Sequence, residues 1–331
     1  MNILIINSLF ILITAFLLGT LLLFFLQRLS KKYKILLIQG TPLIGGFSLA
    51  TAFFLASILG IYLTNAVAKE TSGLIFASLL MLIFGTIDDW RELSVGIKFL
   101  VQIICASVLI AFGVKTQIVY IGAPLNTLIT LIWILAITNA FNHLDIMDGV
   151  AAFTALIVSV AFCVIAFFNH DIKSIVLSLA LIGSILSFLR LNLPAARVYM
   201  GNAGSHFLGF LLAGLALTIS YAPLERRMAL LTPILILGFP IYDTLFLILM
   251  RLLKRKIPFN KSNDHLVLRC LAMGYSKRKA LGFAIFWNLF FVFAAMLAYN
   301  ASNWQAILVL AIVFLIGLWL ARNMSRVAIN D

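Results

Sequence analysis

Charged side chains are scarce in this sequence. Only 11% of its 331 residues are Asp, Glu, Lys or Arg, whereas 63% are hydrophobic. Soluble chains are about a quarter charged and about half apolar, so this composition excludes a soluble globular domain. It indicates an integral membrane protein with almost no domain outside the bilayer.

Cysteine is rare as well, and repeats are lacking. The three thiols, Cys105, Cys163 and Cys270, are not spaced for a metal site or a disulfide framework, so we expect them to face lipid or the protein core. The first apolar run has no basic start and no small-residue cleavage site, so we expect it to be retained as a span. Without repeats or low-complexity tracts, residues 1–331 are expected to form one integral membrane domain.

Long apolar runs are what the sequence has in abundance. A helix that crosses a bilayer needs about 20 mostly apolar residues. On this basis we predict an all-α, polytopic transmembrane helical bundle of about eleven spans. The predicted spans are 3–26, 43–64, 73–87, 97–113, 124–141, 150–168, 174–190, 206–222, 228–250, 280–298 and 305–321. The largest cytoplasmic loop is expected at 251–279.

Basic residues indicate the orientation. With the N-terminus outside and the C-terminus in the cytoplasm, nineteen of the 24 Lys and Arg residues fall on the cytoplasmic side. The outside keeps the other five, which are Lys69, Lys115, Lys173, Arg226 and Arg227. This bias is the positive-inside signal of multi-pass membrane proteins, and it supports the span count and the direction together.

The acidic residues do not follow from this topology. Of the 11 in the chain, seven are expected at the cytoplasmic side: Asp88, Asp89, Glu92, Asp145, Asp148, Asp243 and Asp264. Asp88 and Asp89 are adjacent at the end of a span, where two carboxylates repel each other unless a cation or a proton lies between them. They are either a solvated helix end or a site for a divalent cation or acid–base chemistry.

The stretch "NAFNHLDIMDGV" is the most polar segment between two apolar runs. Asn139, Asn142, Asp145 and Asp148 follow one another at intervals of three residues. If a helix continues through them, this spacing places their side chains on one face. Such a row of oxygen atoms suits a hard cation or a polar sugar, and an ordinary polar loop is the alternative. We expect Gly149 to let the chain turn into the next span.

Two further segments are candidates. In "VYMGNAGSHFLGF" the small residues around Gly201 would leave backbone N–H groups free for phosphate oxygens at the start of a helix, with helix packing as the alternative. Asp243 lies inside a predicted span, where a carboxylate is costly and a functional role is the default expectation. Asp264 and His265 follow in the basic cytoplasmic loop, whose charge also fits topology alone or attraction to anionic lipid.

Five segments in this order resemble the polyprenyl-phosphate N-acetylhexosamine-1-phosphate transferases. They are "TPLIGG", "GTIDDWRELSVGIKFLVQ", "NAFNHLDIMDGV", "RVYMGNAGSHFLGF" and "PIYDTLFLILMRLLKRKIPFNKSNDHLVLRCLAMGYS". The resemblance implies a multi-pass enzyme of the bacterial inner (plasma) membrane with a cytoplasmic active site. Such an enzyme transfers an N-acetylhexosamine 1-phosphate from a UDP-sugar to polyprenyl (undecaprenyl) phosphate and releases UMP, and so starts O-antigen, teichoic acid or peptidoglycan lipid intermediates.

The resemblance also implies roles for individual residues. Catalysis would involve Asp88, Asp89, Asp145, Asp148 and His265. Substrate binding would involve Asn139, Asn142, Lys98, Asp264, Arg269, Gly201 and Ser205. A Mg²⁺ or Mn²⁺ cofactor would be held by Asn202, Asp88 and Asp148. The implied partners are the two substrates, the lipid bilayer and a second copy of the chain in a homodimer, with no nucleic acid.

The chain departs from the family pattern at three places. Asn202 stands where the family usually has an aspartate that binds magnesium, so metal affinity should fall. Ile146 replaces a glycine, and Leu268 and Arg269 occupy a region that usually carries further histidines. A catalytically weakened or inactive relative that binds lipid phosphate or nucleotide sugar is therefore the alternative function. A transporter is disfavoured, because its ionisable residues would lie at mid-membrane.

Overall fold

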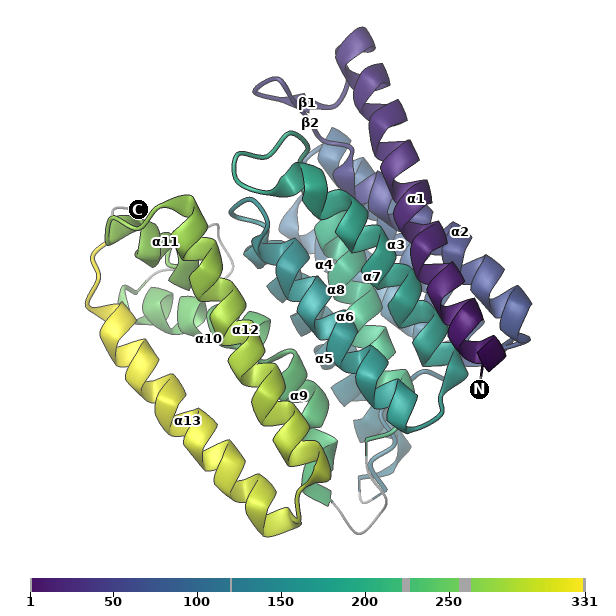
Figure 1. Ribbon diagram of the computed structural model, residues 1–331. Coiled ribbons are helices and arrows are strands. Elements are labelled where there is room, and N and C mark those ends of the chain that lie inside the picture. Colours follow the sequence, from purple (N-terminus) through teal and green to yellow (C-terminus); the bar gives the residue numbers. More distant parts are fainter. Residues whose placement is uncertain (1, 120, 222–226, 256–262, 330–331) are drawn as a thin grey trace. The chain divides into compact units, whose positions relative to one another are not determined.

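The computed structural model describes residues 2–119, 121–221, 227–255 and 263–329, which form two compact units (Figure 1). Unit 1 comprises Met1–Ser220 and unit 2 comprises Tyr221–Asp331. The helices of unit 1 are α1 (Asn2–Tyr33), α2 (Gly45–Thr64), α3 (Lys69–Trp90), α4 (Val95–Ala111), α5 (Gly122–Leu144), α6 (Val150–Phe168), α7 (Ile172–Asn192) and α8 (Gly201–Thr218). A short antiparallel hairpin of β1 (Leu37–Ile38) and β2 (Thr41–Pro42) joins α1 to α2.

Helix α8 lies at the centre of unit 1. It packs against α2, α3, α5 and α6, while α1 and α7 pack together with α2 beside them. Nearly every residue of α8 from Ala203 onward is buried. Because protein surrounds this helix, it can keep Gly, Asn, Ser and His in its first two turns. Its approach to α2 is very close, since a Cβ atom on Gly46 would lie 2.2 Å from the backbone nitrogen of Gly204.

The predicted all-α, multi-pass class is confirmed. Each of the eleven predicted spans coincides with a helix or with a pair of helices. By length and composition, eight helices of the described chain could cross a membrane, and a bent pair in unit 2 would make a ninth. Helix α4 is shorter, at 17 residues, and α8 is not among the eight. The count of eleven and the orientation of the termini therefore stay predictions.

Unit 2 contains η1 (Arg227–Leu231), α9 (Thr232–Ile236), α10 (Gly238–Leu253), α11 (Leu266–Ala272), α12 (Lys277–Asn300) and α13 (Asn303–Ser325). The segment predicted as a span at 228–250 is not one unbroken helix, because the chain bends by 75° between Ile236 and Gly238, and its crossing of the membrane stays a prediction. Pro240 accounts for the break. It has no N–H to donate, and its ring would clash with the carbonyl four residues earlier in an unbroken helix.

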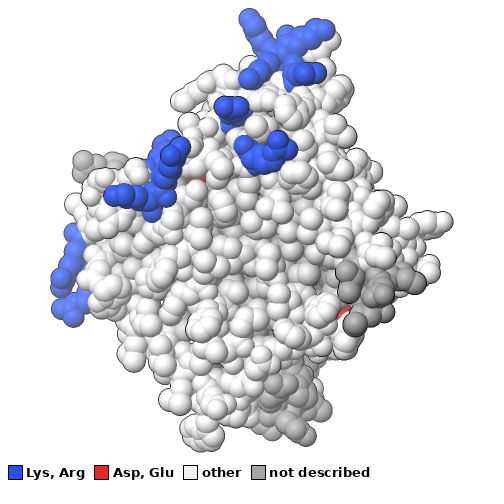
Figure 2. Space-filling view, in the orientation of Figure 1, with Lys and Arg blue, Asp and Glu red and all other residues white. Residues whose placement is uncertain are grey.

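The expected loop at 251–279 is partly helical. It holds the end of α10, all of α11 and the start of α12, while residues 256–262 lie outside the described chain. Figure 2 shows basic side chains gathered where α1 ends, the part of the helix that carries Lys31 and Lys32. The sides of α1 and α13, in contrast, expose large apolar residues such as Leu21 and Trp319, as expected for helices that face lipid.

Candidate functional site

Asp89 joins the end of α3 to the start of α8. One oxygen of its carboxylate accepts a hydrogen bond from the backbone N–H of Asn202 at 2.7 Å, and the other accepts one from Ala203 at 3.0 Å. A carboxylate is favourable here because the first N–H groups of a helix have no partner within the helix. These two amides, which the sequence suggested could be free for phosphate oxygens, are therefore occupied by Asp89.

Gly201 makes this contact possible. Its φ is +72°, and a Cβ atom at this position would lie 2.6 Å from a carboxylate oxygen of Asp89. A side chain would thus face both backbone strain and a steric clash. The small residue predicted to bind substrate is required for the packing of Asp89.

Asp88 points to different partners from its neighbour. The ammonium group of Lys98 donates to one of its oxygens at 2.6 Å, and the backbone N–H of Leu93 donates to the other at 2.9 Å. The Asp88 residue is only 2% exposed, so it is not a solvated helix end. The repulsion expected between the two adjacent carboxylates is offset because each has its own hydrogen-bond donors.

The polar row at 139–148 does not lie on one helical face. Helix α5 ends at Leu144, so the prediction that Asp148 continues the face of α5 was wrong. Asn139 turns toward α4, where it exchanges hydrogen bonds with the side chain of Gln102 at 2.7 and 3.3 Å. Asn142 turns toward α8. Gly149, at a φ of +83°, starts α6 as predicted.

Asn142 contacts two side chains of α8. Its amide nitrogen lies 3.0 Å from Oδ1 of Asn202 and 3.0 Å from Oγ of Ser205. The Ser205 hydroxyl in turn donates to the backbone carbonyl of Gly201. Residues that the sequence separates by about 60 positions are thereby linked through side chains at one end of unit 1.

Asp145 and Asp148 complete the carboxylates of this unit. Asp145 is half-buried, and its pKa is raised to about 7 by burial, to which the negative charges of Asp89 and Asp148 add. One oxygen of Asp148 accepts a hydrogen bond from the backbone N–H of Ala196 at 3.2 Å. Of the hydrogen bonds within the described chain, none reaches the carboxylate of Asp145.

We call this group the carboxylate patch: Asp88, Asp89, Lys98, Asn142, Asp145, Asp148, Asn202 and Ser205. It assembles from the ends of α3 and α5, the short segment between α5 and α6, and the starts of α4 and α8. Sequence reasoning missed two residues that support it. Gln102 holds Asn139, and buried Asn192 accepts from the N–H of Gly149 and donates to the carbonyl of Val198. Their only signal in the sequence was an amide side chain within or at the end of an apolar span.

The other predicted site residues lie in unit 2. His265 Nδ1 lies 2.7 Å from Asp243 Oδ2, and the backbone N–H of Leu266 donates to the other oxygen of Asp243. Asp243 is completely buried, so this carboxylate positions both His265 and the start of α11. A role for His265 in catalysis stays a prediction.

Asp264 and Arg269 are tied into unit 2. Arg269 Nη2 donates to Asp264 at 2.6 Å, while Nη1 donates to the backbone carbonyls of Met324 and Val327. Lys254 donates to the same Asp264 carboxylate. Arg269 is 1% exposed, and its contacts brace α11 against the end of α13. A role of Asp264 and Arg269 in substrate binding stays a prediction.

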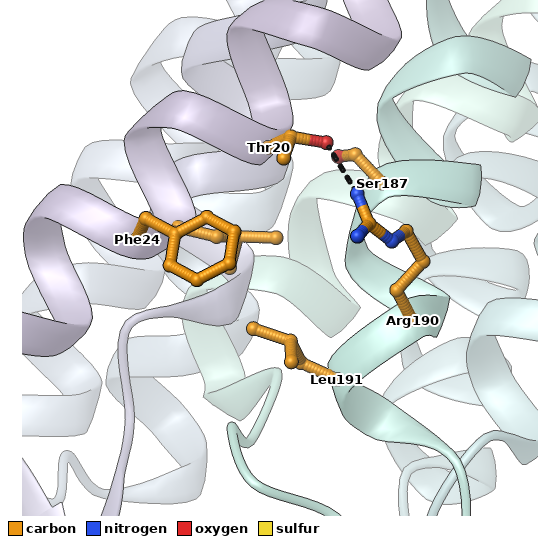
Figure 3. Close-up of a pocket in the computed structure, with 6 residues that line it drawn as sticks. Thr20, Phe24, Ser187, Arg190 and Leu191 are labelled. Carbon is orange, nitrogen blue, oxygen red and sulfur yellow. Dashed lines mark hydrogen bonds between the residues drawn. The ribbon is translucent and has the colours of Figure 1, made fainter.

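A shallow hollow in unit 1 lies between α1 and α7 (Figure 3). Its labelled residues include Arg190, whose guanidinium donates to the hydroxyl of Thr20 at 3.3 Å and lies over the ring of Phe16. Most of the remaining lining is apolar, with Leu23, Phe24 and Leu191. None of the residues of the carboxylate patch lines this hollow.

Comparisons with known proteins agree on one family. A profile described as glycosyl transferase family 4 matches residues 71–220, which include the whole carboxylate patch. A decaprenyl-phosphate N-acetylglucosaminephosphotransferase of Mycolicibacterium smegmatis is 31% identical over 80% of this chain and 72% of its own length.

Two other relatives carry similar names. A probable undecaprenyl-phosphate N-acetylglucosaminyl 1-phosphate transferase of Bacillus subtilis is 29% identical over 83% of this chain and 78% of its own. The undecaprenyl-phosphate alpha-N-acetylglucosaminyl 1-phosphate transferase of Escherichia coli K12 is 28% identical over 81% of this chain and 78% of its own.

Proposed function

This chain belongs to the family of polyprenyl-phosphate N-acetylhexosamine-1-phosphate transferases, and on that premise we propose how its residues carry out the reaction. The enzyme transfers an N-acetylhexosamine 1-phosphate from a UDP-sugar to polyprenyl phosphate and releases UMP. The relatives are named for N-acetylglucosamine, so UDP-N-acetylglucosamine is the donor to test first. No observation favours the alternative of an inactive relative.

The observation that carries this proposal is the assembly of the carboxylate patch. Asp89 reaches residues 113 and 114 positions away in the chain, and its charge acts on Asp145. Burying several carboxylates together is unfavourable unless a cation or another ligand stabilises their negative charges. An arrangement of this kind is typical of an active site, where perturbed carboxyl groups gather.

The reaction needs little acid–base chemistry. An oxygen of the polyprenyl phosphate attacks the phosphorus that carries the sugar, a new P–O bond forms, and the bond from that phosphorus to the bridging oxygen breaks. The electron pair of this bond stays with UMP. Because the attacking phosphate oxygen is already ionised, the protein contributes mainly through positioning and electrostatics.

A divalent cation fits the patch without a full set of protein ligands. No group of three or more His, Cys, Asp or Glu side chains is arranged to hold a metal within the described residues. Mg²⁺ is commonly held by one or two carboxylates together with substrate phosphates and water. We propose that Asp145, whose carboxylate accepts no hydrogen bond within the described chain, holds Mg²⁺ or Mn²⁺ together with Asp148, whose charge acts on it. The ion would offset the negative charge of the diphosphate.

The remaining patch residues position the substrates. Asp89 holds the start of α8, and Asn142 orients the side chains of Asn202 and Ser205. Lys98, half-buried, offsets the charge of Asp88, so that less negative charge of the patch opposes the approach of two anionic substrates. For His265, which lies in unit 2, a catalytic role stays a proposal.

The protein is a multi-pass membrane protein, and we propose the bacterial inner membrane with the patch at the cytoplasmic side. The support is the bias of basic residues toward the loops on that side. The homodimer remains a prediction.

The proposal is tested with the purified chain in detergent, UDP-N-acetylglucosamine and undecaprenyl phosphate. Release of UMP and formation of labelled lipid-linked sugar are measured for the wild type, for Asp145→Asn and for Asp171→Asn. The last is a matched control, because Asp171 caps α7, is predicted to lie outside, and Asn is also a good cap. We expect no product with Asp145→Asn and full activity with Asp171→Asn. Full activity in Asp145→Asn would contradict the proposal.

A further inference from the structure

The orientation of the Asn142 amide is fixed by its neighbour on α8. The hydroxyl of Ser205 donates its one hydrogen to the carbonyl of Gly201 at 3.0 Å. At its other contact it can therefore only accept a hydrogen bond, and the atom of Asn142 that lies 3.0 Å away must be the NH₂ group.

This orientation fixes that of Asn202 in turn. The NH₂ group of Asn142 has a second hydrogen, and it lies 3.0 Å from the side chain of Asn202. The atom of Asn202 at this contact must be an acceptor, so it is the carbonyl oxygen Oδ1. The NH₂ group of Asn202 then points away from Asn142. Within the described chain its Nδ2 has no hydrogen-bond acceptor, and the residue is only partly buried.

The chemical character of position 202 follows from this chain of contacts. An aspartate here would accept from Asn142 with one oxygen and offer the other oxygen outward, as a ligand for a cation. Asparagine offers a donor at the same place. The backbone N–H of Asn202 is already used by Asp89, so the side-chain NH₂ is what this residue presents to a ligand.

We propose that Asn202 donates a hydrogen bond from its side-chain NH₂ group directly to an anionic oxygen of the sugar-nucleotide diphosphate and is not a ligand of the metal ion. The proposal rests on the proposed function, since it names a contact within the same site. A hydrogen bond from this amide replaces part of the charge neutralisation that a cation at this position would supply. The chain should therefore hold its donor substrate with less dependence on divalent metal.

The test is binding of UDP-N-acetylglucosamine to the detergent-purified chain by equilibrium dialysis, once with a metal chelator and once with Mg²⁺. Wild type, Asn202→Asp and Asn202→Ala are compared. Because a hydrogen bond to a charged group is worth about tenfold or more in affinity, we expect both variants to bind about tenfold more weakly than wild type in chelator. Mg²⁺ should restore the nucleotide affinity of Asn202→Asp, because the outward oxygen of the aspartate can hold the ion. The affinity of Asn202→Ala should stay below that of wild type even with Mg²⁺.

Ser94→Asp is the matched control for added negative charge. Ser94 is exposed and caps α4, and Asp is an equally good cap, so its binding should equal that of wild type in both conditions. A second measurement, binding of Mn²⁺ without nucleotide followed by electron paramagnetic resonance, should give the same affinity for wild type and Asn202→Ala.

The outcomes separate this inference from the function on which it rests. Wild-type binding that disappears in chelator, unchanged binding by Asn202→Ala in chelator, or a loss of Mn²⁺ affinity in Asn202→Ala would each overturn the inference while transfer activity remained. If the wild type neither binds nor turns over UDP-N-acetylglucosamine or another UDP-N-acetylhexosamine, the proposed function itself is wrong.

Discussion

Asp88 and Asp89 are neighbours in the chain, yet different groups stabilise their carboxylates. Asp88 is held by an ammonium group and one amide, and Asp89 by two amides at the start of a helix. Asp145 receives neither kind of support, and burial, together with the charges of Asp89 and Asp148, raises its pKa to about 7. At the scale of single residues, the carboxyl group with the least support from the protein is the one we expect to act on a ligand.

Asp145 should make stability depend on pH. Its folded pKa of about 7 lies above the usual value, which is about 4 in an unfolded chain. Between these two values the folded state binds more protons, so stability falls as pH rises, and the loss is complete above the folded pKa. In chelator, Asp145→Asn should therefore melt at a higher temperature than wild type at pH 8, and by a clearly smaller margin at pH 5. An equal difference at both pH values would contradict this origin.

Lys98 should be needed for stability because it neutralises a buried carboxylate. Removal of one partner from a buried ion pair costs about 3 kcal/mol, since the other charge is left unpaired. We expect Lys98→Met to lower the free energy of unfolding by that order, and Lys98→Met with Asp88→Asn to recover part of it. Chemical denaturation of the purified variants measures both. If the two substitutions are additive, Lys98 and Asp88 are not coupled.

At the scale of elements, the position of α8 decides whether the site forms. Its first turn is held by Asp89 from α3, by Asn142 from α5 and by the close approach of α2. Backbone hydrogen bonds from Gly45 to Tyr199 and from Gly46 to Met200 add a further connection. Small shifts of α2 or α8 should therefore change the positions of the side chains in the carboxylate patch.

Gly46→Ala tests this contact. The added methyl group would lie 2.2 Å from the backbone of Gly204, and a backbone atom cannot move aside as a flexible side chain can, so we expect lower thermal stability and loss of transfer activity. Gly96→Ala is the control, since nothing lies within 4 Å of its Cβ position and alanine favours a helix by about 0.5–1 kcal/mol. Equal melting temperatures for the two variants would mean that α2 can move away without cost.

Apolar patterning predicted the elements well because a bilayer demands long apolar helices. It predicted less of the site. The spacing of the polar row suggested one helical face, but the chain leaves the helix at Leu144. Nothing in the sequence pairs Asp89 with the amides of α8, because that contact depends on the packing of α3 against α8. Pro240 was a usable signal for the bend in unit 2 that the hydropathy of 228–250 concealed.

At the scale of the whole molecule, the distribution of Lys and Arg indicates the orientation of the chain in the membrane. Nineteen of the 24 basic residues fall on one side of the predicted topology, and the patch lies at the ends of helices that this topology places in the cytoplasm. Reporter proteins fused to each terminus test the orientation. We expect a reporter that is active only in the cytoplasm to work at the C-terminus and to fail at the N-terminus. The reverse pattern would place the patch outside, away from a cytoplasmic sugar nucleotide.

The tie between Asp89 and α8 has a consequence for how the protein is made. The amides that cap this carboxylate belong to residues synthesised 113 and 114 positions later. A growing chain therefore leaves the ribosome with Asp89 lacking these two partners until α8 has been made. The reactive surface should thus close only when α8 is added, and chains cut short before α8 should be inserted but open to cleavage by proteases at the end of α3.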